Sequence, residues 1–147
     1  MRTSSAKAKG RRAVQELQAL VLRWFPDLTQ RDVRVTPSGS TGEDLQLSQA
    51  AAEQFPYAVE VKNVERLNIW QSLLQTTRHA ARVGLEPLLA FRRNRSELWI
   101  AVRAEHFFQL AGVVDSRRGN QKQAQEPSPA LQDSVQKGRS YGFDDEE

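Results

Sequence analysis

Four residues of this chain could together hold a divalent cation and act on a phosphodiester: Asp44, Glu60, Val61 and Lys62. Magnesium binds oxygen ligands and keeps several waters, so two carboxylates and the backbone carbonyl of Val61 would suffice to hold it. Such an ion polarises a phosphoryl oxygen, while the Lys62 ammonium could orient the attacking water or stabilise developing negative charge. The residue types therefore predict a site for Mg²⁺, or Mn²⁺ in its place, on Asp44, Glu60 and Val61.

Two predicted strands must position these side chains. Residues 57–62 read as one strand, in which successive side chains alternate between faces, so Glu60 and Lys62 share a face. Residues 44–48 read as a second short strand, entered from a Gly/Ser-rich loop. Asp44 and Glu60 converge if these strands pair. A Glu-x-Lys pair alone is also common on a solvated strand face, so the prediction depends on that pairing.

The order of these residues resembles that of the PD-(D/E)XK nuclease superfamily, in which an acidic residue on a helix precedes an Asp on one strand and Glu-x-Lys on the next. The corresponding residues are Glu16, Asp44, Glu60 and Lys62, and Glu43 stands where the family has proline. Within the superfamily the chain is most similar to small Holliday-junction resolvase-like and phage-type endonucleases. That similarity rests on residues 9–12 before Glu16, the loop 37–40 before Asp44, and Gln75 on the following helix.

The resemblance covers roughly residues 7–110. It implies a magnesium-dependent DNA endonuclease, acting on branched or structured DNA as a homodimer, on a restriction-endonuclease-like core. The implied catalytic residues are Glu16, Asp44, Glu60, Lys62 and Gln75. Catalytic residues do not encode the substrate, so a restriction-type or homing-type nuclease stays open. So does a non-catalytic DNA-binding or assembly protein on the same fold.

The distribution of charge predicts an anionic partner. Residues 1–112 carry 16 Lys and Arg against 11 Asp and Glu, whereas residues 113–147 carry 5 against 7. Residues 1–12 form a basic N-terminal arm without an acid, and such patches attract phosphate backbones. Solvated basic clusters are also frequent on ordinary surfaces. The predicted DNA-binding residues are Lys7, Lys9, Arg11, Arg12, Arg34, Ser38, Ser40 and Arg78.

The composition excludes several classes of site and of location. The chain has no cysteine, which excludes disulfides and thiolate zinc sites, and its two histidines argue against a histidine-rich metal site. No apolar run reaches the roughly 20 residues of a membrane span, and the N-terminal segment is not that of a signal peptide. We therefore expect a cytoplasmic protein with no membrane association and no organic cofactor.

The periodicity of apolar residues predicts an α/β fold, a five-stranded mixed sheet flanked by helices, within a domain of residues 4–112. The last two strands are continuously apolar and are expected to be buried on both faces. Phe107, Phe108 and Leu110 are expected in the core or a dimer contact. Residues 113–147 are predicted to be an acidic-ended tail, disordered over most of 115–147 because few apolar side chains are present. The predicted elements are helices 4–25, 69–83 and 105–111 and strands 32–35, 44–48, 57–62, 88–91 and 98–102, with 49–55 unassigned.

Overall fold

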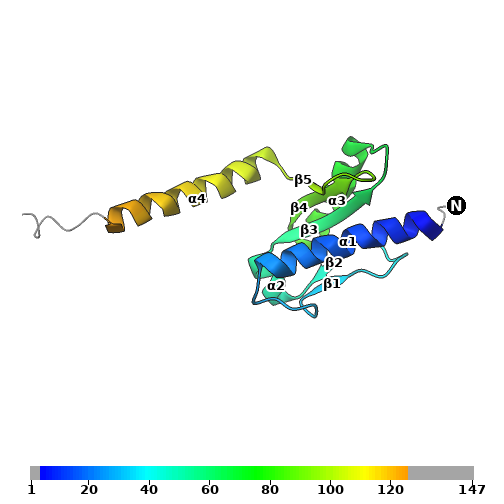
Figure 1. Ribbon diagram of the computed structural model, residues 1–147, viewed down its shortest axis with the longest axis horizontal. Helices are drawn as coiled ribbons and strands as arrows, with labels where there is room; N and C mark the ends of the chain where they lie inside the picture. The colour runs from blue at the N-terminus through cyan, green and yellow to red at the C-terminus, as the bar shows by residue number, and fades with distance from the viewer. Residues whose placement is uncertain (1–3, 126–147) are drawn as a thin grey trace, which may run out of the picture. The chain divides into compact units, whose positions relative to one another are not determined.

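The computed structural model describes residues 4–125, which divide into two compact units between Arg103 and Ala104. This boundary lies nine residues before the predicted one at residue 112, because the last helix already belongs to the second unit. The elements are α1 (Ser4–Trp24), β1 (Val33–Val35), β2 (Leu45–Leu47), α2 (Gln49–Gln54), β3 (Tyr57–Asn63), α3 (Ile69–Val83), β4 (Glu86–Arg92), β5 (Trp99–Ala101) and α4 (Ala104–Gln125) (Figure 1).

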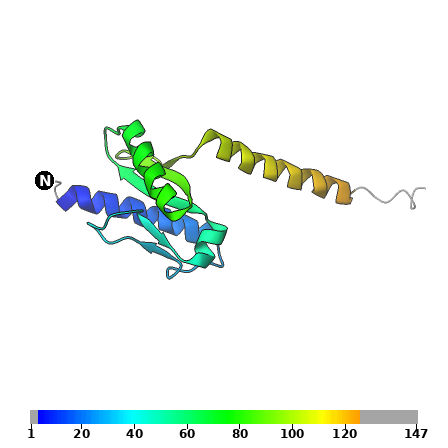
Figure 2. The same cartoon turned by 180° about the vertical axis from the view of Figure 1, so that it is seen from behind.

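The first unit places helices on both faces of a sheet, as Figures 1 and 2 show from opposite sides. β3 and β4 pair in parallel through the crossover helix α3, and β5 pairs antiparallel with β4. Val59 and Val61 of β3 pack in the core cluster with Leu17 and neighbouring residues of α1. Because side chains alternate along a strand, Glu60 points to the other face, which α3 covers. The α/β prediction is therefore confirmed.

The five strands form two sheets, so the prediction of a single five-stranded sheet is wrong. β1 and β2 form an antiparallel pair, and β3, β4 and β5 form the second sheet. The two sheets meet where the Asp44 N–H donates to the Val59 carbonyl at 2.8 Å. β2, which follows Asp44, is only three residues long, and α2 begins two residues after it ends. The backbone hydrogen bonding between Asp44 and β3 therefore does not extend along β2.

Local sequence signals account for the helices next to the site. Asn68 caps α3 by accepting a hydrogen bond from the Gln71 N–H at 3.1 Å, and Gly84 ends the helix in a left-handed conformation with φ of +69°. The predicted helix 69–83 is confirmed. The unassigned segment 49–55 holds α2, for which Ser48 is the N-cap.

The burial prediction is confirmed for β4 and wrong for β5. Leu88, Leu89 and Ala90 of β4 are buried, since this strand lies between β3 and β5 and packs against α3. Leu88 and Ala90 also belong to the core cluster that contains residues of α1. Trp99 and Ile100 of β5 are 61% and 51% exposed. β5 is an edge strand of three residues, so its apolar character does not reflect burial on both faces.

The second unit contains a longer helix than predicted. α4 extends to Gln125, past the predicted end at residue 111 and into the segment predicted to be disordered. Arg, Gln, Lys and Ala in residues 115–125 favour helix by intrinsic propensity, even where few apolar side chains are present. Within the second unit Phe107 and Phe108 are 55% and 69% exposed, and Leu110 is also exposed. The rest of the predicted tail, residues 126–147, lies outside the described residues. No helix within residues 4–125 is long and apolar enough to cross a membrane.

Candidate metal and phosphodiester site

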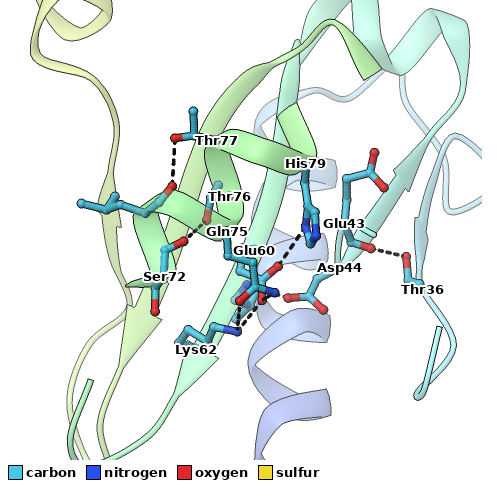
Figure 3. Close-up of polar contacts among 12 residues, drawn as sticks. Thr36, Glu43, Asp44, Glu60, Lys62, Ser72, Gln75, Thr76, Thr77 and His79 are labelled. Atoms are coloured by element: carbon cyan, nitrogen blue, oxygen red, sulfur yellow. Dashed lines mark hydrogen bonds and ion pairs between the residues drawn. The ribbon is translucent and has the colours of Figure 1, made fainter. Parts of the chain in front are cut away.

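Glu60, Lys62 and Gln75 form a closed set of polar contacts between β3 and α3 (Figure 3). The Lys62 ammonium forms an ion pair with Glu60 Oε1. Gln75 Nε2 donates to the same oxygen at 3.0 Å, and Gln75 Oε1 accepts from Lys62 Nζ at 3.4 Å. Because Glu60 is only 5% exposed, these contacts fix a buried carboxylate in place.

Asp44 is held beside Glu60 by two hydrogen bonds to β3. Its Oδ2 accepts from the Val61 N–H at 2.6 Å, and its own N–H donates to the Val59 carbonyl. The loop before it is closed by Thr36, whose Oγ1 donates to the Glu43 carbonyl at 2.7 Å. The structure therefore places the carboxylate of Asp44 against the strand that carries Glu60, as Figure 3 shows.

Two carboxylates in one partly dehydrated site repel each other. Burial, the largest cause, and the charge of Glu60 together raise the pKa of Asp44 from its ordinary value near 3.8 to about 6. The hydrogen bond from Val61 and the nearby charges of Lys62 and His79 oppose that rise. A bound cation would relieve this repulsion, which is the electrostatic character expected of a metal site.

His79 belongs to this site, although it was not among the predicted site residues. Its Nδ1 lies 3.5 Å from Glu60 Oε2 and is buried without a hydrogen bond. His79 follows Gln75 by four residues, so both face the same side of α3. That spacing was the available signal, since any residue four positions after Gln75 must face the same strand.

A cavity of about 460 Å³ opens above these carboxylates. It joins the N-terminal half of α1, the loop 36–44 and the middle of β3. The predicted residues that line it are Lys7, Arg11, Ser38, Ser40, Asp44, Glu60, Val61 and Lys62. Predicted catalytic and DNA-binding side chains therefore meet at one cavity.

The remaining predicted DNA-binding residues lie elsewhere. Arg12 and Arg34 are exposed and do not line this cavity. Lys9 is also exposed, and its backbone carbonyl accepts a hydrogen bond from Asn63 Nδ2 at 3.2 Å. Arg78 lines a second concavity, formed by α3.

Glu16 is not brought to the site. Arg92 Nη1 donates to Glu16 Oε2 at 2.5 Å, an ion pair between β4 and α1, and Glu16 does not line the cavity. Glu16 is exposed beside buried Leu17, at the border of the apolar face of α1, and this position suits the ion pair with Arg92 at the end of β4.

Replacing Glu16 by glutamine is expected to change any metal-dependent cleavage rate by less than about threefold. The carboxylate pairs with Arg92, and exposed ion pairs contribute about 0–1 kcal/mol to stability. Cleavage rates and urea denaturation of the Glu16→Gln variant would check this. A loss of activity comparable to that of a metal-ligand variant would place Glu16 in the catalytic set instead.

The donor set suits a hard cation. Within residues 4–125 there is no group of three or more histidine, cysteine or acidic side chains that could hold a metal. The oxygen donors at the cavity are the carboxylates of Asp44 and Glu60 and the backbone of Val61, whose side chain is buried. Such oxygen donors, completed by water, fit Mg²⁺ or Mn²⁺ better than a softer metal.

Comparisons with protein-family models, with curated proteins and with solved structures found no match to this chain. Its function must therefore be argued from the geometry and chemistry of the site.

Proposed function

We propose that this protein is a metal-dependent DNA endonuclease that hydrolyses phosphodiester bonds. The observation that carries the proposal is the hydrogen bond from the Val61 N–H to Asp44 Oδ2, which sets Asp44 beside Glu60 and Lys62 at one cavity. This is the convergence that the resemblance to PD-(D/E)XK nucleases requires. That resemblance also motivates a restriction-endonuclease-like core and a substrate of branched or structured DNA.

Asp44, Glu60 and the Val61 carbonyl would hold Mg²⁺ or Mn²⁺. When bound, the ion would supply Lewis-acid polarisation of the scissile phosphate and would neutralise charge. The fit is supported by the raised pKa of Asp44, because burial and the neighbouring carboxylate disfavour an unpaired negative charge there.

Lys62 supplies a positioned cation at the cavity. Its ammonium is held by Glu60 Oε1 and Gln75 Oε1, so it is oriented before substrate binds. From there it donates a hydrogen bond to the attacking water or to a non-bridging phosphate oxygen, and stabilises negative charge as it grows. Gln75 acts as a positioning residue, because its amide contacts both Glu60 and Lys62.

The rim of the cavity suits a phosphate backbone. Lys7 and Arg11 lie four residues apart on α1 and therefore on one face of the helix. The loop hydroxyls of Ser38 and Ser40 line the same cavity. Cations and hydroxyls of this kind contact phosphates and set the register of a strand. A homodimer would bring two such sites to the two strands of one substrate.

Cleavage of a labelled four-way junction tests the proposal, with linear duplex and single strand of matched sequence as comparison substrates. We expect cutting in Mg²⁺ or Mn²⁺ and none in EDTA. Preferential cutting of the junction would support structured DNA as the substrate. Tight binding without cutting of any substrate in either condition would contradict the nuclease and favour a non-catalytic DNA-binding protein.

A further inference from the structure

One side of α3 is exposed, cationic and partly apolar. We call it the α3 outer face; its residues are Trp70, Gln71, Leu74, Arg78 and Arg82, all exposed. All but Trp70 line a concavity of about 370 Å³, and Trp70 lies one helical turn before Leu74 at its border. The whole helix Ile69–Val83 contains no acidic residue. The surface therefore offers two guanidinium groups and an indole to a partner.

This surface is continuous with the proposed catalytic site. Gln75 and His79 line the same concavity, and both approach Glu60 with their polar atoms. Figure 3 shows these two side chains directed from α3 toward Glu60 and Lys62. A strand whose phosphate lies at Lys62 can therefore continue onto the α3 outer face.

The side chains present match an unpaired nucleic-acid strand. Arg78 and Arg82 are one turn apart, a rise of about 6 Å along the helix, and guanidinium groups bind phosphates. Trp70 is 79% exposed, and an exposed aromatic ring can stack on a base. In a duplex the flat faces of the bases are already stacked, so the ring can reach only an unpaired base.

A second copy of the chain fits this face poorly. In a two-fold symmetric contact the same patch meets itself, so Arg78 and Arg82 would face Arg78 and Arg82 of the second copy. Like charges opposed in this way cost several kcal/mol, and α3 has no carboxylate to offset them. The charge therefore favours an anionic partner.

We propose that the α3 outer face binds an unpaired segment of DNA, with Arg78 and Arg82 on phosphates and Trp70 stacked on a base. The inference rests on the proposed function for its link to cleavage, and it deepens that function by naming single-stranded regions as what the protein recognises. Binding can be measured without cutting, so the two proposals can fail separately.

Fluorescence anisotropy in EDTA, with a labelled single-stranded oligonucleotide and the matching duplex, tests the role of Trp70. The Trp70→Ala variant is expected to bind the single strand about tenfold more weakly and the duplex as well as the wild type does. Trp24→Ala is the matched control, since Trp24 is 74% exposed at the end of α1, away from this face. It is expected to change neither affinity.

The role of the two arginines is tested by salt dependence. Removing Arg78 and Arg82 together should lower the slope of log affinity against log salt for the single strand by about 1.4, or about 0.7 for each lost phosphate contact. Arg23 and Arg31, exposed on other elements, provide the matched double variant, whose slope should equal that of the wild type.

Three results would overturn the inference. Trp70→Ala could bind the single strand as the wild type does, or it could lose duplex and single-strand affinity equally. It could also leave DNA affinity intact while sedimentation shows that a dimer dissociates, which would make this face an interface between copies. Failure of the proposed nuclease function would give a different result: the wild-type protein would bind DNA and would not cut it in Mg²⁺.

Discussion

Replacing Lys62 by alanine is expected to lower the Mg²⁺-dependent cleavage rate by about 10²–10³-fold, with little change in DNA affinity. Removing one preorganised donor from a site of developing negative charge has effects of that size. The ammonium is held by Glu60 and Gln75, so its orientation costs little when the substrate arrives. Single-turnover rates with protein in excess would isolate this chemical step from product release.

Lys9→Ala is the matched control for this variant, because Lys9 is an exposed lysine that does not line the cavity. It should lower affinity slightly and leave the single-turnover rate unchanged. Equal rates for Lys62→Ala and the wild type at saturating protein would remove Lys62 from the mechanism.

Replacing Asp44 by asparagine is expected to abolish cleavage and to stabilise the fold near pH 7 by up to about 3 kcal/mol. The folded pKa of Asp44 is about 6, whereas an unfolded aspartate ionises near 3.9. The fold therefore disfavours the charged form. Below about pH 4 both states are protonated and there is no penalty. Stability falls as the pH rises from about 4 to 6, because the unfolded state ionises first, and the penalty is complete above that window. Asparagine does not ionise, and its carbonyl can still accept from the Val61 N–H.

Urea denaturation at about pH 4 and about pH 7.5 checks this prediction. The stability gained in Asp44→Asn should be present at the higher pH and vanish at the lower one. Saturating Mg²⁺ should raise the stability of the wild type and not that of the variant, since only the wild type keeps both carboxylates. The exposed Asp27, which does not line the cavity, serves as control: Mg²⁺ should raise the stability of Asp27→Asn as it does that of the wild type. A variant that is less stable at both values would show that the carboxylate supports the fold.

The sequence was sufficient for features that a few adjacent residues determine. The cap at Asn68 and the end at Gly84 follow from local hydrogen bonds and backbone conformation, and the helix between them has the predicted bounds, 69–83. Alternation along the predicted strand 57–62 likewise put Glu60 and Lys62 on one face, and in the structure Val59 and Val61 on the other face belong to the core.

The sequence was insufficient where distant residues decide. β2 would belong to the same sheet as β3 only if their backbone hydrogen bonds continued past the one between Asp44 and Val59. No local sequence pattern determines how far such pairing extends. The partner of Glu16 is Arg92, 76 residues away. His79 lies at the site because α3 packs against β3. The spacing of apolar residues predicts a helix, but it does not predict which strand the helix packs against.

The junction at Asp44 couples the integrity of the site to the weaker part of the fold. β1 and β2 form a two-stranded sheet, and such sheets have little stability of their own. β3, β4 and β5 form the larger sheet, and this hairpin is held to the rest of the unit by the Asp44 contacts with β3 and by Val33 and Leu45 in the core cluster. Local opening would then separate Asp44 from Glu60 in molecules whose main sheet is intact. A molecule in which this contact has opened would keep its main sheet and lack a complete site, so any interaction that ties the hairpin to β3 would increase the competent fraction.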